Sequence, residues 1–209
     1  MKICLYDSGI GVIPFIYQAL KNKYNASFYI YIDSKNFPYG NKDDSQLVKI
    51  LSKNLKKLKK YNFDYIFITC NTISRIYLEN KYLHQVNVRT ILEYNLKNRE
   101  SYKLLATSSL SKKYPSICLD GKDLATNIEN NEIKEIIKKI KNIKDKVVLG
   151  CTHYHLIKSL LPYYQKNFLS FENEIFNNLL FDSPLQIYSR KKDLPILKKY
   201  LKIDIKIYK

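Results

Sequence analysis

The stretch that decides the fold is the start of the chain, where the apolar run Lys2–Tyr6 (KICLY) leads directly into Asp7–Gly11 (DSGIG). A short apolar run bounded by turn residues is typical of a buried strand. Glycine and small polar residues after such a strand favour a turn into a helix, and Pro14 suits the first turn of that helix. We therefore expect a strand, a turn and a helix that extends to about Lys23.

The same alternation of strand and helix continues through the first half. Strands are expected at Ser27–Ile32, Tyr65–Ile68 and Val88–Leu92. Apolar residues recur every three or four positions in Ser45–Lys60 with the lysines between them, which predicts an amphipathic helix. Another helix is expected to follow the third strand and to end near Lys81.

The second half repeats this plan. Strands are expected at Lys103–Ala106, 117–119 and Lys146–Leu149, with an amphipathic helix at Glu132–Ile143. The last third is expected to be helical until a final edge strand at Ile203–Ile207. This order predicts an α/β fold with two similar lobes, mostly parallel sheets and an active site in the cleft between the lobes.

The expected lobes divide the chain into three parts. Residues 1–93 form the first lobe with Cys70, and residues 94–180 form the second lobe with Cys151. Residues 181–209 form a C-terminal segment that returns to the first lobe.

The charge of the chain is large but does not point to a nucleic-acid partner. The 36 Lys and Arg residues against 19 Asp and Glu give a net charge of +17, and 32 of the 36 are Lys. Lysine belongs to the residues with A+T-rich codons, as do the abundant Ile, Asn and Tyr, so this pattern favours genome composition over selection for a polyanion partner as the origin of the charge. A lysine-rich surface alone supports only weak, salt-sensitive binding to nucleic acid.

Other classes of protein are excluded by simple features. The 45% hydrophobic and 26% charged residues are an ordinary globular mixture. No apolar run approaches the roughly 18 residues needed to span a bilayer, and charge appears too early for a signal peptide. The four cysteines lack the close spacing of a disulfide framework or a C-x-x-C metal site. We expect a cytoplasmic protein with reduced thiols and no membrane partner.

Small polar residues follow each principal strand. They lie at Asp7-Ser8, Cys70–Thr72, Thr107-Ser108 and Cys151–His153. In each half, one strand ends in a cysteine that is followed within two residues by a threonine. Each cysteine alone is explained as a small buried residue at a strand end. Two in matching places, each beside polar groups, instead suggest that both lobes offer a thiol to a shared cleft.

Four stretches of the sequence occur in the order seen in one enzyme family. Asp7–Gly11, Pro38–Lys42, Cys70–Ser74 and Gly150–Tyr154 resemble glutamate racemase, within the aspartate/glutamate racemase superfamily. The last string, GCTHY, favours glutamate over aspartate racemase. Weaker similarities are Thr90–Glu93, which resembles a strand with an acidic end, and Leu180–Ser183, which resembles a late turn back to the first lobe. The chain is identified as a shortened member, because the region between Thr107 and Gly150 is short for the family.

The resemblance implies a chemistry for the two thiols. It implies a cofactor-independent and metal-free racemase that interconverts L- and D-glutamate by two-base 1,1-proton transfer and supplies D-glutamate for peptidoglycan. Cys70 and Cys151 would act as base and acid, with Asp7 near Cys70 and His153 near Cys151 as proton-handling partners. A free thiol titrates near ~8.5, close enough to neutrality for either role.

The resemblance also implies a set of substrate contacts, made by side chains and by the backbone of the 39–40 loop. The set is Asp7, Ser8, Tyr39, Gly40, Asn71, Thr72, Thr152 and His153. Ser8, Thr72 and Thr152 are equally well placed to cap helices. Tyr39 could equally be a surface aromatic residue of a loop.

Departures from the family pattern concern the second lobe most. His155 stands where the family usually has Pro, and we expect it to be an exposed residue at a helix start. Glu129 and Asp120 are both candidates for the glutamate that contacts the family's histidine. A metal site formed by Cys151, His153 and His155 is not predicted, because no fourth ligand is evident.

Two other readings of the sequence stay open. The substrate could be aspartate or a related acid, or the chain could be a degenerate racemase-like binding protein without activity. The family is often dimeric, so a homodimer is an expectation as well.

Overall fold

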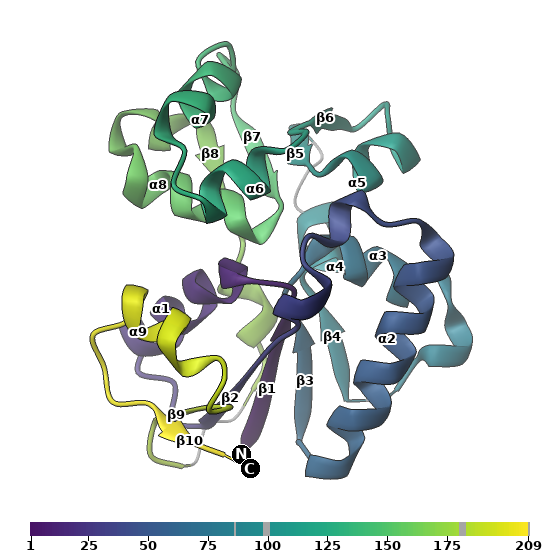
Figure 1. Cartoon of the computed structure of the whole chain (residues 1–209), viewed down its shortest axis with the longest axis vertical. Helices are drawn as coiled ribbons and strands as arrows, with labels where there is room; N and C mark the ends of the chain where they lie inside the picture. Colours follow the sequence, from purple (N-terminus) through teal and green to yellow (C-terminus); the bar gives the residue numbers. More distant parts are fainter. Residues whose placement is uncertain (86, 98–100, 180–182, 209) are drawn as a thin grey trace.

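The computed structural model describes residues 1–85, 87–97, 101–179 and 183–208, and contains two parallel sheets (Figure 1). The first sheet has the strand order β10-β9-β2-β1-β3-β4. Its strands are β1 Lys2–Asp7, β2 Ser27–Ile32, β3 Tyr65–Ile68, β4 Val88–Thr90, β9 Gln186–Ser189 and β10 Lys206–Ile207. Every pairing in this order is parallel, and β1 lies between β2 and β3.

The second sheet forms the other lobe, at the top of Figure 1. Its strand order is β6-β5-β7-β8, again with parallel pairings. The strands are β5 Lys103–Ala106, β6 Cys118–Asp120, β7 Val147–Gly150 and β8 Phe168–Leu169. The predicted α/β class with two mostly parallel sheets is therefore confirmed.

Helices cover both sheets, and most of them are short. The α-helices are α1 Ile13–Lys21, α2 Asp44–Leu58, α3 Asn71–Glu79, α4 Ile91–Lys97, α5 Ser108–Lys113, α6 Leu124–Glu129, α7 Ile133–Ile140, α8 Ile157–Leu160 and α9 Leu194–Tyr200. The 3-10 helices are η1 Ile10–Val12, η2 Ser34–Asn36, η3 Tyr39–Asn41, η4 Lys59–Tyr61, η5 Lys81–Leu83, η6 Thr152–Leu156, η7 Pro162–Asn167 and η8 Glu174–Phe176.

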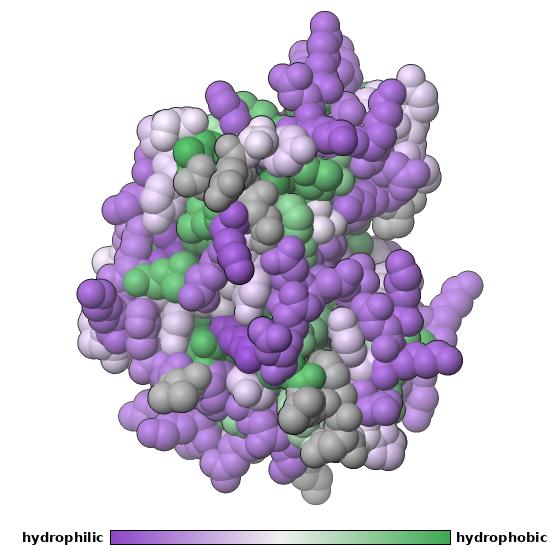
Figure 2. Space-filling view, turned by 180° about the vertical axis from the view of Figure 1, so that it is seen from behind, coloured by the Kyte–Doolittle hydropathy of each residue, from purple (hydrophilic) through white to green (hydrophobic). Residues whose placement is uncertain are grey.

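The longest helix, α2, forms for clear sequence reasons. Asp43 and Gln46 close a capping box, with the Gln46 N–H donating to Asp43 Oδ1 at 2.8 Å. The leucines at 47, 51, 55 and 58 are buried, because they recur on one face of the helix. The lysines of α2 are exposed on the other side of the helix. The opposite face of the molecule is also largely hydrophilic (Figure 2).

The central strand β1 divides the core, because alternate side chains point to opposite faces of a strand. Ile3 and Leu5 join the larger apolar cluster, which also contains Leu149 and Cys151 of the second lobe. Cys4 and Tyr6, on the other face, join a first-lobe cluster with Cys70 and α2. One apolar cluster thus connects the two lobes beneath the ends of β1 and β7.

Two expected elements differ from the structure. The strand expected at Val88–Leu92 ends at Thr90, and Ile91 begins α4. Glu93 accepts hydrogen bonds from the Thr90 N–H at 3.2 Å and from Thr90 Oγ1 at 2.6 Å. These bonds satisfy a donor at the helix start, so the two apolar residues after Thr90 continue as helix.

The expectation of a helical last third was wrong. This region contains the strands β8 and β9, and the final strand is limited to β10. Each of these strands is short and pairs with another strand of its sheet: β8 with β7, β9 with β2, and β10 with β9. Local sequence patterns do not reveal such pairings.

The C-terminal strands β9 and β10 lie in the first sheet, next to β2. The division at residue 93 falls within α4, and the boundaries at 93/94 and 180/181 stay predictions. Residues 180–182 of the expected late turn lie outside the described residues. Across the described ranges, no helix is long and apolar enough to cross a membrane.

Candidate active site

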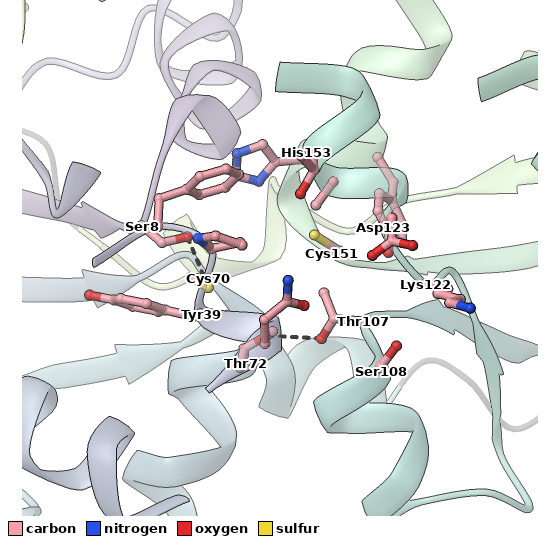
Figure 3. Close-up of a pocket in the computed structure, with 17 residues that line it drawn as sticks. Ser8, Tyr39, Cys70, Thr72, Thr107, Ser108, Lys122, Asp123, Cys151 and His153 are labelled. Carbon is pink, nitrogen blue, oxygen red and sulfur yellow. Dashed lines mark hydrogen bonds between the residues drawn. The ribbon is translucent and has the colours of Figure 1, made fainter. Parts of the chain in front are cut away.

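A small cavity lies between the lobes, at the carboxyl ends of the central strands (Figure 3). Its volume is about 30 Å³. Seven of the ten residues predicted for the site line it: Ser8, Tyr39, Gly40, Cys70, Thr72, Cys151 and His153. Asp7, Asn71 and Thr152 are buried immediately beside lining residues in the chain. The structure therefore brings the predicted residues of both lobes together.

Cys70 follows β3 and precedes α3, and its thiol is buried. Ser8 Oγ lies 3.7 Å from Cys70 Sγ and donates to it (Figure 3). Burial raises the pKa of the Cys70 thiol to about 12, and the Asp7 charge acts in the same direction. Hydrogen bonds from the backbone at Ile73 and Thr72 and from Ser8 oppose this effect only in part.

Cys151 follows β7 in the same way and precedes η6. Burial raises the pKa of this thiol as well, and the nearby Cys70 and Asp7 raise it further. Backbone hydrogen bonds from His153 and Tyr154 act in the opposite direction. The raised pKa values favour the protonated form of both thiols at neutral pH.

Asp7 lies at the end of β1, fully buried, and connects the lobes. Its Oδ2 accepts from Thr69 Oγ1 at 2.7 Å and from Thr152 Oγ1 at 3.0 Å, whereas its Oδ1 accepts from the Gly9 N–H at 3.2 Å. Burial raises the pKa of Asp7, although His153 and these hydrogen bonds pull it downward. These three hydrogen bonds fix the position of the Asp7 carboxyl group.

His153 is held on both sides. Its Nε2 lies 2.9 Å from Glu129 Oε2, and its ring packs on Phe37 with centroids 5.1 Å apart. A Cβ at Gly9 would lie 2.7 Å from His153 Nε2, so the approach of the ring requires glycine there. Between the two acidic candidates, the structure places Glu129 next to the histidine. Asp120 instead accepts from Ser108 Oγ at 2.9 Å.

The hydroxyls proposed as alternative helix caps have other partners. Ser8 faces Cys70, Thr152 donates to Asp7, and Thr72 Oγ1 lies 3.0 Å from Thr107 Oγ1 across the cleft. Asn71 Oδ1 accepts from the side chain of Asn95. Among the described residues, the buried Asn71 Nδ2 has no hydrogen-bond partner, and Asn71 follows Cys70, which lines the cavity.

Tyr39 is not a surface aromatic residue, and that interpretation was wrong. Its side chain is buried in the first lobe, where the hydroxyl donates to Asp33 Oδ2 at 2.7 Å and bonds to the Tyr6 hydroxyl at 2.8 Å. This anchor holds the 39–40 backbone at the cavity. A Cβ at Gly40 would lie 3.0 Å from the Thr107 side chain, so the loop closely approaches the second lobe.

His155 is also not exposed, contrary to expectation. It is buried, and its Nδ1 forms a hydrogen bond with Glu172. Its ring stacks on that of Phe15, with the ring centroids 6.3 Å apart. Glu172, which no sequence pattern singled out, is buried with it. In the described part of the chain, no group of three or more His, Cys, Asp or Glu side chains is arranged to hold a metal ion.

The cavity is small in this structure. A volume of about 30 Å³ holds only one or two water molecules. Besides the contact between Thr72 and Thr107, the buried Arg75 donates to Ser109 Oγ at 3.2 Å and thereby links α3 to α5. These two contacts hold the lobes together beside the cavity.

The chain is similar to glutamate racemases in sequence and in structure. The curated glutamate racemase of Aliivibrio fischeri is 28% identical over 185 residues, which covers 75% of this chain and 70% of that protein. A glutamate racemase isoform from Bacillus anthracis has a TM-score of 0.75 at 18% identity, covering 99% of this chain and 96% of that one. The Francisella tularensis glutamate racemase, solved in complex with D-glutamate, has a TM-score of 0.69 at 20% identity over 100% of this chain and 96% of its own.

No family model matches the chain. The similarity to glutamate racemases that the four motifs predicted is confirmed by the curated relatives, and the fold is confirmed by the solved structures.

Proposed function

We propose that this chain is a glutamate racemase that interconverts L- and D-glutamate by two-base proton transfer between Cys70 and Cys151, without a cofactor. One observation supports this most strongly. The two thiols come from different lobes, each at the carboxyl end of a central strand, and both line one cavity. Two acid/base groups from opposite walls can reach the two faces of one carbon.

The reaction needs one thiolate and one thiol. The thiolate removes the α-proton of glutamate from one face, and the thiol on the other face returns a proton to the same carbon. The α-carbon is inverted, the first cysteine ends protonated, and the second ends as thiolate. The roles reverse in the other direction, so no oxidant or reductant is required.

The negative charge that develops next to the α-carbon needs hydrogen-bond donors. Asn71 Nδ2 is buried and unpartnered among the described residues, which suits it to an oxygen of the α-carboxylate. The hydroxyls of Ser8, Thr72 and Thr152 and the Tyr39–Gly40 backbone would complete the contacts. Asp7 and His153 would assist proton transfer at Cys70 and Cys151 respectively, from positions below and beside the cavity.

The proposal extends to the cellular role. D-glutamate is an amino acid of peptidoglycan, so the product would supply cell-wall synthesis. The enzyme would act in the cytoplasm, as a homodimer. The similarity to curated glutamate racemases favours this reading over an aspartate racemase or an inactive binding protein.

The direct test is formation of D-glutamate from L-glutamate, resolved by chiral chromatography, with a chelator present and no added cofactor. We expect D-glutamate to form until the isomers are equal. A higher rate of D-aspartate formation from L-aspartate would show that aspartate is the preferred substrate. Absence of the D-isomer with both acids would contradict the proposed racemase activity.

The pH dependence follows from the raised thiol pKa values. Since burial raises the pKa of Cys70 to about 12 and raises that of Cys151, the form with one thiolate is scarce at neutral pH and grows tenfold for each pH unit. We expect kcat/KM to rise with a logarithmic slope near one between about pH 6 and pH 8, measured at constant ionic strength. A flat profile over this range would contradict the protonated resting state.

Glu129 gives a second prediction, because it orients His153 through a hydrogen bond of 2.9 Å. Glu129→Gln keeps the shape but removes the charge, and loss of one charge-assisted bond is worth about 2 kcal/mol, or about thirtyfold in kcat/KM. Glu132→Gln is the matched control, because Glu132 is exposed and bonds to Asn127 and Asn130. Equal rates in the two variants would show that the Glu129 carboxylate has no role.

A further inference from the structure

A second, wider cavity of about 690 Å³ adjoins the catalytic cavity. The two share Gly40, Asn41, Ser108, Lys122 and Asp123 in their linings. The wider cavity is more open and also has Lys42, Lys112 and Lys113 in its walls. A substrate that approaches through it must pass the shared residues to reach the thiols.

Lys122 differs from the rest of the catalytic cavity in charge. Among the described residues that line this cavity, it alone is a lysine or arginine. His153, also in the wall, is already bonded to Glu129, and Asp123 carries a negative charge. A substrate with two carboxylates and one ammonium group carries a net charge of −1, so a cation in this wall adds a charge-assisted partner to the neutral donors of the cavity.

The position of Lys122 is fixed by the turn that carries it. Asp120 Oδ1 accepts from the Lys122 N–H at 2.8 Å and from Ser108 Oγ at 2.9 Å. A Cβ at Gly121 would collide with the Tyr154 hydroxyl, so the turn packs on the segment that follows Cys151.

The backbone of Lys122 is anchored, whereas its side chain is exposed. Lys122 and Asp123 both have positive φ angles, 22° and 23°, which non-glycine residues rarely adopt and which often occur at functional sites. The side chain itself is exposed, and Lys122 lines both cavities. In Figure 3 it lies near Asp123, at the edge of the catalytic cavity. An anchored backbone with an exposed side chain suits contact with an incoming ligand.

We propose that Lys122 determines specificity for acidic amino acids by binding the side-chain carboxylate of the substrate. This inference rests on the proposed function, because that function places the α-carbon between Cys70 and Cys151. The side chain of glutamate then extends from the thiols toward the mouth of the cavity, where the long stem of Lys122 brings its ammonium group within reach. An alanine-like side chain would gain nothing from this contact.

The test compares L-glutamate with L-glutamine, which has a neutral side chain of the same shape, by α-deuterium exchange in deuterated water. In Lys122→Met, we expect KM for glutamate to rise about tenfold or more, with a smaller change in kcat. The preference for glutamate over glutamine in kcat/KM falls by a similar factor. Lys122→Gln should behave like Lys122→Met, whereas Lys122→Arg should recover most of the preference.

Lys112→Met is the matched control, because Lys112 lines only the wider cavity and its loss changes the net charge equally. We expect its preference for glutamate to stay within about twofold of the unmodified protein, because only screened long-range attraction is lost. An equal fall in both variants, or an unchanged preference in Lys122→Met, would overturn the inference alone. No exchange by the unmodified protein would instead overturn the proposed function together with the inference.

Discussion

Replacement of either Cys70 or Cys151 by serine is expected to reduce racemisation by about 10³-fold or more, because general acid–base catalysis contributes up to about 10⁴-fold. A hydroxyl is a far weaker acid than a thiol, so serine cannot supply the base on its face of the α-carbon. Both positions are buried and lie at strand ends, where serine fits the space of cysteine closely. The rate is measured as D-glutamate formed from L-glutamate, and as the reverse.

Cys118→Ser provides the control, because Cys118 lies in β6 and does not line the cavity. We expect that variant to keep the rate of the unmodified protein within a few-fold. Full activity in Cys70→Ser or in Cys151→Ser would reject the two-thiol mechanism, since one remaining thiol cannot serve both faces.

Replacement of Glu172 by glutamine is expected to lower the free energy of unfolding by about 3 kcal/mol at pH 7. Burial by itself raises the pKa of Glu172, but the charge and hydrogen bond of His155 outweigh it and lower the pKa from 4.5 to about 2. A shift of that size corresponds to about 3 kcal/mol. Removal of one partner of a buried pair has costs in the same range. Denaturant unfolding measures the difference.

The stability that Glu172 contributes depends on pH. The pKa of Glu172 is depressed in the folded protein, so its stabilising effect is present above the unfolded value of 4.5 and is lost as the pH falls toward about 2. The gap between the unmodified protein and Glu172→Gln should therefore close across that window. Glu135→Gln, which alters an exposed residue of α7, should change stability by less than about 0.5 kcal/mol. A constant gap down to pH 2 would contradict the ion pair.

Much of the fold can be read from the sequence, because the strands that flank the site are short apolar runs bounded by turn residues. The expected strand at 65–68 coincides with β3, and that at 103–106 coincides with β5. The apolar residues Ile91 and Leu92 fit a strand as well as a helix. Whether they form a strand or a helix depends on the hydrogen bonds between Thr90 and Glu93, which hydrophobic periodicity does not reveal.

The sequence is less informative about burial of polar residues. His155 and Tyr39 are buried because each finds a partner elsewhere, Glu172 for one and Asp33 for the other. Sequence spacing also does not show whether Glu129 or Asp120 contacts His153, because that contact depends on tertiary packing. Packing of α6 against η6 places Glu129 at the histidine, whereas Asp120 stays with the turn of Lys122.

The most direct test of the two-thiol mechanism is the fate of the α-proton in deuterated water. L-glutamate is converted to a small extent, and the deuterium content of both isomers is measured by mass spectrometry after chiral separation. Because one thiol removes the proton and the other supplies one from solvent, we expect deuterium in the D-glutamate formed and almost none in the remaining L-glutamate. Comparable deuterium in the remaining L-glutamate, as a single base serving both faces would produce, would contradict the mechanism.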